Sequence, residues 1–121
     1  MDKKNLVGQI HNSMYQQVKK QGYATTVGVL MDIGILSKVD YERWRNGHVD
    51  YLERVCKVNL HKLSEIAKII RQYADKKNLK QSWAFYRQWK CSEKRKLRFS
   101  KSGGDSIEKS YATHYVAAKA R

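Results

Sequence analysis

The residues best suited to chemistry form a basic arm, residues 94–104, that ends in the pair Gly103-Gly104. Lysine and arginine side chains neutralise phosphate groups and release condensed counterions, which gives affinity without sequence selectivity. The glycine pair precedes an expected helix, whose free N–H groups can receive an anion. The order SKSGG is not that of a P-loop, because its lysine precedes the glycines. We predict phosphate contacts from the arm and its neighbours: Arg87, Lys90, Lys94, Arg95, Lys96, Arg98 and Lys101.

An aromatic cluster stands directly before the arm, in the sequence SWAFYRQWK. Its rings are Trp83, Phe85, Tyr86 and Trp89, and unpaired bases stack on such rings when cations flank them. A small domain also needs its large aromatic residues in the core, which is the simpler role for most of these rings. We predict that Tyr86 is the ring left exposed for stacking.

A second basic group surrounds the turn Asn46-Gly47. It consists of Arg43, Arg45, His48 and Arg54. The sequence leaves open whether this group shares a surface with the arm. It also leaves open that both groups are ordinary solvated surface charge.

Patterns typical of metal sites and catalytic sites are missing from the sequence. The histidines His11, His48, His61 and His114 are scattered, with no HExxH and no CxxC pair. Cys56 and His61 are five residues apart, a spacing that does not place them on one face of a helix. No nucleophile elbow or closely spaced acid pair is present. We predict no enzyme activity, no metal and no cofactor.

The net charge of +14 is the extreme value in the composition, and it is unevenly distributed. Residues 1–50 carry 7 Lys+Arg and 5 Asp+Glu, whereas residues 51–121 carry 18 and 6. Such an excess opposes compaction by self-repulsion, so it indicates a polyanionic partner.

The function that this charge favours is nucleic-acid binding through the C-terminal half, tolerant of sequence and dominated by phosphate contacts. RNA or single-stranded nucleic acid is at least as well supported as duplex DNA, because no helix reads as a recognition helix. The alternative is a small basic protein-interaction module, an adaptor or inhibitor. Such a module would dock on an acidic protein surface or on the nucleic-acid channel of an enzyme.

Length and composition predict one folded domain spanning residues 1–121. Apolar residues make up 41% of the 121 residues, there is no proline, and glycine is sparse at 7. No apolar run approaches the roughly 18 residues of a membrane span, and the N-terminus lacks the apolar core of a secretory signal. Cys56 and Cys91 are far apart and unpatterned, which favours a reducing, cytoplasmic setting.

The elements expected to position these residues are all helical, with residues 51–77 as the long central helix. Its apolar stripe repeats in steps of three and four residues. Two short helices around Gly34 resemble a helix-turn-helix in spacing, but charged Asp40 and Arg43 would face the first helix, so a packing hairpin fits better. The sequence therefore predicts an all-α bundle of about six helices. They cover 3–21, two short stretches between 23 and 47, 51–77, 83–90 after Ser82, and a last helix capped by Asp105 with Glu108.

Overall fold

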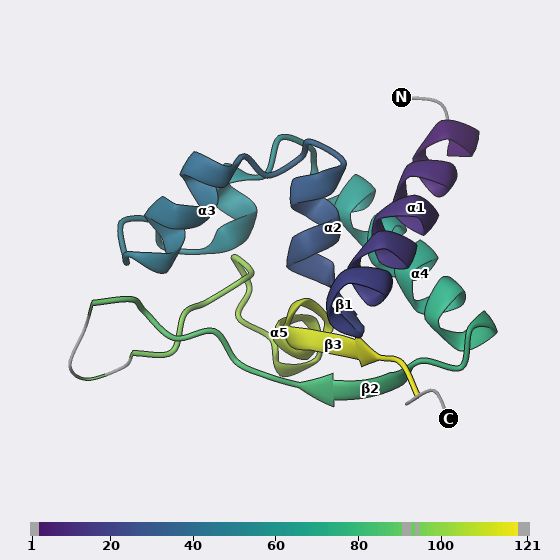
Figure 1. Ribbon diagram of the computed structural model, residues 1–121. Helices are drawn as coiled ribbons and strands as arrows, with labels where there is room; N and C mark the ends of the chain where they lie inside the picture. Colours follow the sequence, from purple (N-terminus) through teal and green to yellow (C-terminus); the bar gives the residue numbers. More distant parts are fainter. Residues whose placement is uncertain (1–2, 91–92, 94, 119–121) are drawn as a thin grey trace.

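The computed structural model of the chain describes residues 3–90, 93 and 95–118. Within these residues the chain forms five α-helices, one short 3-10 helix and a three-stranded antiparallel sheet (Figure 1). In chain order the elements are α1 (Lys3–Gln21), β1 (Tyr23–Thr25), α2 (Thr26–Asp32), α3 (Lys38–Arg45), the 3-10 helix η1 (Leu52–Val55), α4 (Leu60–Lys76), β2 (Lys80–Trp83), α5 (Asp105–Ala112) and β3 (Thr113–Val116).

The prediction of an all-α bundle with about six helices is wrong, because the chain also contains a sheet. Strand β3 lies in the middle, and Val116 is the partner of Tyr23 on one side and of Lys80 on the other. The three strands are three or four residues long. Strands this short contain too few residues for a two-residue alternation to be recognised in the sequence.

The helices of the N-terminal half lie within the predicted ranges, 3–21 and two short stretches between 23 and 47, although strand β1 was not predicted. Helix α1 buries Leu6, Ile10 and Met14 completely, and Gly22 ends it with φ of +88°. In the next two helices the caps are local hydrogen bonds. The Thr25 hydroxyl accepts from an amide of α2 at 2.9 Å, and the Ser37 hydroxyl accepts from an amide of α3 at 3.0 Å.

The predicted central helix of residues 51–77 is interrupted. Helix α4 begins only at Leu60, where the Asn59 side chain accepts from the Lys62 amide at 2.9 Å. Residues 52–55 instead form η1, and the amides of Leu52 and Glu53 donate to carbonyls of the basic arm at 3.2 and 2.9 Å. The first amides of a helix have no partner within it, so carbonyls of the arm satisfy donors that a helix would leave free. The chain leaves helical geometry at Cys56, whose backbone is extended, before α4 begins.

The segment predicted as a helix at 83–90 is extended. After β2 the chain runs outward and returns, and the Gln88 amide donates to Arg95 at 2.7 Å while the Leu97 amide donates to Tyr86 at 2.8 Å. This pairing continues as an isolated bridge between Arg87 and Lys96. We call residues 84–101 the basic hairpin, and Figure 1 shows it extending from β2 beneath α3.

The capping prediction for the last helix is also wrong. Gly104 is the N-cap of α5 and makes no side-chain cap bond. Glu108 does not complete a capping box. Its carboxylate lies 9% exposed and binds the hairpin, accepting from the amides of Phe99 and Ser100 at 3.0 and 2.7 Å and from the Ser100 hydroxyl at 2.6 Å. The arm is thus fastened to α5.

The core brings the helices and the hairpin together. Trp44 of α3 and Phe99 of the hairpin are fully buried, with ring centroids 5.1 Å apart. The Trp44 indole N–H donates to the Arg98 carbonyl at 2.8 Å. Leu97 is 4% exposed, so Leu97 and Phe99 hold the arm to the core, while Arg95, Lys96 and Arg98 face solvent.

Candidate functional site

Five of the predicted phosphate-binding residues are exposed on the basic hairpin. They are Arg87, Lys90, Arg95, Lys96 and Lys101. None of these five residues forms an ion pair with a carboxylate of the described residues. The ion pairs found there join Asp40 to Arg43, Asp50 to Arg54 and Glu65 to Lys62. Lys94 lies outside the described residues. The five cations can therefore meet an anion without first breaking an ion pair.

Arg98 differs from the other predicted phosphate ligands, because its guanidinium is used by its own loop. The Nε atom donates to the Ser100 carbonyl at 2.7 Å, and an Nη atom donates to the Lys101 carbonyl. The guanidinium also lies 3.4 Å from the position that a side chain on Gly103 would take. Arg98 holds the turn at 98–103 in shape, which makes it a structural residue first.

The glycine turn does not present free amides to an anion. The Gly103 amide donates to the Ser100 hydroxyl at 3.0 Å, and the Gly104 amide donates to the Ser102 hydroxyl at 3.3 Å. Asp105 follows in the first turn of α5 and adds a negative charge there. The serines thus satisfy both glycine amides, and Asp105 disfavours an anion at the helix N-terminus, so we assign the phosphate contacts to the side chains of the hairpin.

The expectation that Tyr86 is the exposed stacking ring is not met. Tyr86 packs edge-on against Phe99 at 5.4 Å between centroids, and burial raises its pKa to about 12. The exposed rings are Trp83, Phe85 and Trp89, at 57%, 38% and 38%. Trp89 lies at the turn and contacts Arg45 and Tyr41 of α3, and Arg45 also contacts Tyr86. Trp83 and Phe85 occupy alternate positions of an extended chain. A two-residue alternation in the sequence is the signal that could have identified them.

Cations and rings are interleaved along the exposed side of the hairpin. Lys96 Nζ lies 3.7 Å from the centroid of the Phe85 ring, and Lys109 Nζ of α5 lies 4.9 Å from that of Trp83. Both distances are within the range of favourable cation–π attraction. Each ring thus combines a flat apolar face with an adjacent positive charge.

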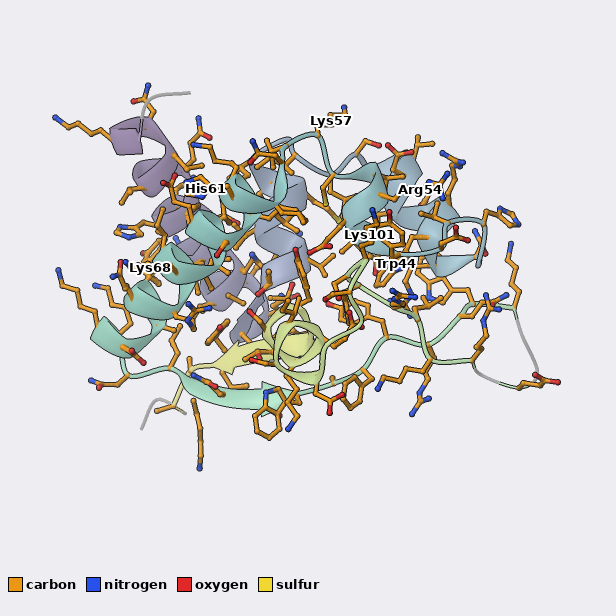
Figure 2. The ribbon with its side chains drawn as sticks, turned by 180° about the vertical axis from the view of Figure 1, so that it is seen from behind. Trp44, Arg54, Lys57, His61, Lys68 and Lys101 are labelled. Atoms are coloured by element: carbon orange, nitrogen blue, oxygen red, sulfur yellow. The ribbon has the colours of Figure 1, made fainter. Side chains whose placement is uncertain are left out.

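The second basic group divides into two kinds of residue. Arg43 and Arg54 form exposed ion pairs with carboxylates of Asp40 at 3.2 Å and Asp50 at 2.9 Å, and His48 is exposed. Figure 2 shows Arg54 near Lys101, at the end of the molecule that carries the hairpin, whereas His61 and Lys68 lie along α4. The Lys101 amide donates to the Glu53 carboxylate at 3.0 Å, which joins η1 to the arm.

Arg45 is the unusual member of this group. It is half-buried, and its guanidinium carbon lies 5.0 Å from the centroid of Tyr86 and 4.7 Å from that of Trp89. Its Nη1 donates to the Tyr41 hydroxyl at 2.9 Å, and its carbonyl accepts from the Trp89 amide at 2.7 Å. The second basic group therefore adjoins the basic hairpin through Arg45. The sequence alone leaves open whether the two groups share a surface.

Metal binding and membrane spanning find no support in the part of the chain that the structure describes. No three His, Cys, Asp or Glu side chains there are grouped to hold a metal ion. Nor does a described helix combine the length and hydropathy needed to cross a bilayer. Burial raises the pKa of the Cys56 thiol to about 12, with further contributions from the charges of Glu53 and Asp40. This thiol is protonated at neutral pH and is a poor nucleophile.

Comparison with known proteins gives no match to a family model, to a curated protein or to a solved structure. The functional argument therefore rests on the residues themselves.

Proposed function

We propose that the protein binds single-stranded nucleic acid or unpaired regions of RNA through the basic hairpin. The observation that carries this proposal is the alternation of exposed rings and unpaired cations on one extended segment. Trp83 and Phe85 are exposed rings two residues apart, and Arg87 follows at the same spacing. This combination is typical of surfaces that bind unpaired strands, which present both phosphates and unstacked bases.

Phosphates and bases would be bound by different residues. Phosphates would be neutralised irrespective of sequence by Arg87, Lys90, Arg95 and Lys101. Bases would stack on Trp83 and Phe85, each contributing about 1–3 kcal/mol by analogy with other aromatic platforms. Because every base has a π face, such binding tolerates sequence. We place this activity in the cytoplasm, where the two cysteines of the chain stay reduced.

The test is a salt titration of binding to a fluorescein-labelled oligouridylate, measured by fluorescence anisotropy. The test variant combines Arg87→Gln, Lys90→Gln, Arg95→Gln and Lys101→Gln. The control variant removes the same charge from exposed positions on α1 and α4, with Lys19→Gln, Lys68→Gln, Lys76→Gln and Lys77→Gln. Four lost phosphate contacts should reduce the magnitude of the slope of log K against log salt by about 3.

The control variant should retain most of the wild-type slope, because its charges lie away from the hairpin. Equal slopes for the two variants would remove the hairpin from the proposal. A duplex of the same length, used as competitor, should bind more weakly, because paired bases are not available to the rings. Equal competition by the duplex would show that the hairpin binds phosphates alone and that its rings do not stack on bases.

A second candidate function is favoured by one other observation, an apolar groove of about 400 Å³ between α4 and α5. Leu60 and Ile107 at this groove remain 58% and 45% exposed. Arg71 also lines it. An apolar groove with a nearby cation suits an acidic, amphipathic protein segment, as in a basic interaction module. A partner recovered by pull-down that survives nuclease treatment, and that is lost with Ile107→Glu, would favour this function.

A further inference from the structure

A cleft of about 720 Å³ opens on the face of the sheet opposite the exposed Trp83 ring. Helices α1, α2 and α3 line it together with β1, β3 and the start of the basic hairpin. Its volume is within the range of small-molecule binding sites, roughly 300–1,000 Å³. Of the exposed rings Trp83, Phe85 and Trp89, Phe85 lines this cleft and the other two do not.

The walls of the cleft are rich in aromatic rings. Tyr23 and His114 lie stacked, with centroids 5.3 Å apart and planes at 6°. The cleft is also lined by Tyr41 of α3 and by Phe85 and Tyr86 of the basic hairpin. A planar aromatic ligand finds flat surfaces here on which it can stack.

Two polar atoms of the cleft lack partners. Arg45 Nε and His114 Nε2 are both buried, and neither has a hydrogen-bond partner. No carboxylate of the described residues lies within ion-pair distance of Arg45, and the exposed Lys20 stands at the cleft on α1. The carboxylate of Asp32 also lines the cleft, where it accepts from the Ser13 hydroxyl at 2.6 Å. A half-buried guanidinium without a carboxylate partner is suited to an anionic ligand.

We propose that this cleft binds one nucleotide, with its base against the stacked rings of Tyr23 and His114 and its phosphate at Arg45. The ligand combines the two features that the cleft accommodates, a planar ring and an anion. The exposed amide of Gln16, which carries both a donor and an acceptor, is placed at the same cleft to meet a base edge. The nucleotide is either free or one unit of a strand held by the hairpin, and in the second case the inference rests on the proposed function.

The test measures binding of the four ribonucleoside 5′-monophosphates by isothermal titration calorimetry. Arg45→Met removes the charge and keeps most of the apolar stem, and it should weaken binding at least tenfold. Because Arg45 also packs against three rings, a second variant on the exposed surface is needed. Lys20→Glu should weaken binding about fivefold through charge reversal, whereas Lys19→Glu, the neighbouring exposed residue outside the cleft, should leave it unchanged.

Two further probes separate the parts of the ligand. Adenosine and inorganic phosphate should each compete weakly against the monophosphates. Competition by inorganic phosphate as strong as that by the monophosphates would overturn the role of the base. Binding that is identical in wild type, Arg45→Met and Lys20→Glu would overturn the cleft as the site.

The oligouridylate distinguishes the two sources of the nucleotide. Weaker oligouridylate binding by Lys20→Glu but not Lys19→Glu, without monophosphate binding, would assign the cleft to a unit of a strand. Monophosphate binding without oligouridylate binding would support the cleft and refute the proposed function. Oligouridylate binding that depends on the hairpin cations and not on Lys20 or Arg45, without monophosphate binding, would refute the cleft alone. The absence of both would refute both.

Discussion

The carboxylate of Glu108 accepts two hydrogen bonds from Ser100 through one oxygen, from the amide at 2.7 Å and from the hydroxyl at 2.6 Å. Its other oxygen accepts from the Phe99 amide at 3.0 Å. A single side chain on α5 therefore positions the end of the basic hairpin. Phosphate-binding residues on either side of Ser100 depend on this attachment.

Substitution Glu108→Ala should destabilise the protein by about 3 kcal/mol, because two buried amides and a hydroxyl lose their acceptor. Glu108→Gln retains the shape but one of the acceptor oxygens becomes a donor, so we expect an intermediate loss. Urea denaturation followed by circular dichroism measures both. Glu42→Ala on α3, whose carboxylate makes no ion pair among the described residues, is the control. A loss below about 1 kcal/mol for Glu108→Ala would show that the attachment is dispensable.

Trp83→Ala should weaken oligouridylate binding by about five- to a hundredfold with little change in thermal stability, because the ring is 57% exposed. Tyr86→Ala should do the reverse and lower the melting temperature, since that ring packs against Trp44 and Phe99. Anisotropy and thermal melts on the same preparations check both halves. Unchanged oligouridylate binding by Trp83→Ala, Phe85→Ala and Trp89→Ala together would exclude stacking on the hairpin.

Alkaline pH should destabilise the protein partly through Tyr86. Burial raises the pKa of this hydroxyl from 10.0 to about 12, so between pH 10 and 12 the unfolded state has lost the proton that the folded state retains. Unfolding then releases a proton, and the stability present below pH 10 is lost as the pH rises. The urea midpoint should fall less steeply over this range in Tyr86→Phe than in wild type. Identical pH profiles would show that Tyr86 ionises freely in the folded protein.

The Cys56 thiol should resist alkylation while the protein is folded. With Cys91→Ser as background, iodoacetamide at mildly alkaline pH should modify Cys56 at least about a hundredfold more slowly than in urea, because burial raises its pKa from 9.0 to about 12 and keeps it protonated. Mass spectrometry of the labelled protein over time gives both rates. Similar rates with and without urea would mean that the thiol is accessible and ionised in the folded state.

Helices that depend on local signals could be predicted from the sequence. The predictions were wrong where contacts with distant segments determine the local structure. Helix α1 and the caps Thr25 and Ser37 depend on residues within a few positions of each other. Residues 52–55 are not continuous with α4, and the amides of Leu52 and Glu53 pair with the arm more than 40 residues later. The helix predicted at 83–90 was wrong because this segment pairs with residues 95–97, a contact that no local pattern indicates.

The candidate site was predictable to a similar extent. Exposed cations follow from composition, since charged side chains stay at the surface unless they are paired. The packing of β3, α3 and Phe99 decides which ring faces solvent. This packing is not visible in the sequence, so the prediction of an exposed ring fell on Tyr86 and not on Trp83. The cleft could not be predicted because its walls come from segments far apart in the chain, from Gln16 of α1 to His114 of β3.

The central position of β3 in the sheet has a consequence for biosynthesis. Tyr23 and Lys80 both have Val116 as their partner, so neither outer strand can pair before this last strand has left the ribosome. During translation the nascent chain carries two unpaired strand edges beside a growing excess of positive charge. The nascent chain therefore has to avoid misassembly while it is close to the polyanionic ribosome surface. Chaperones that shield strand edges would protect it during this time.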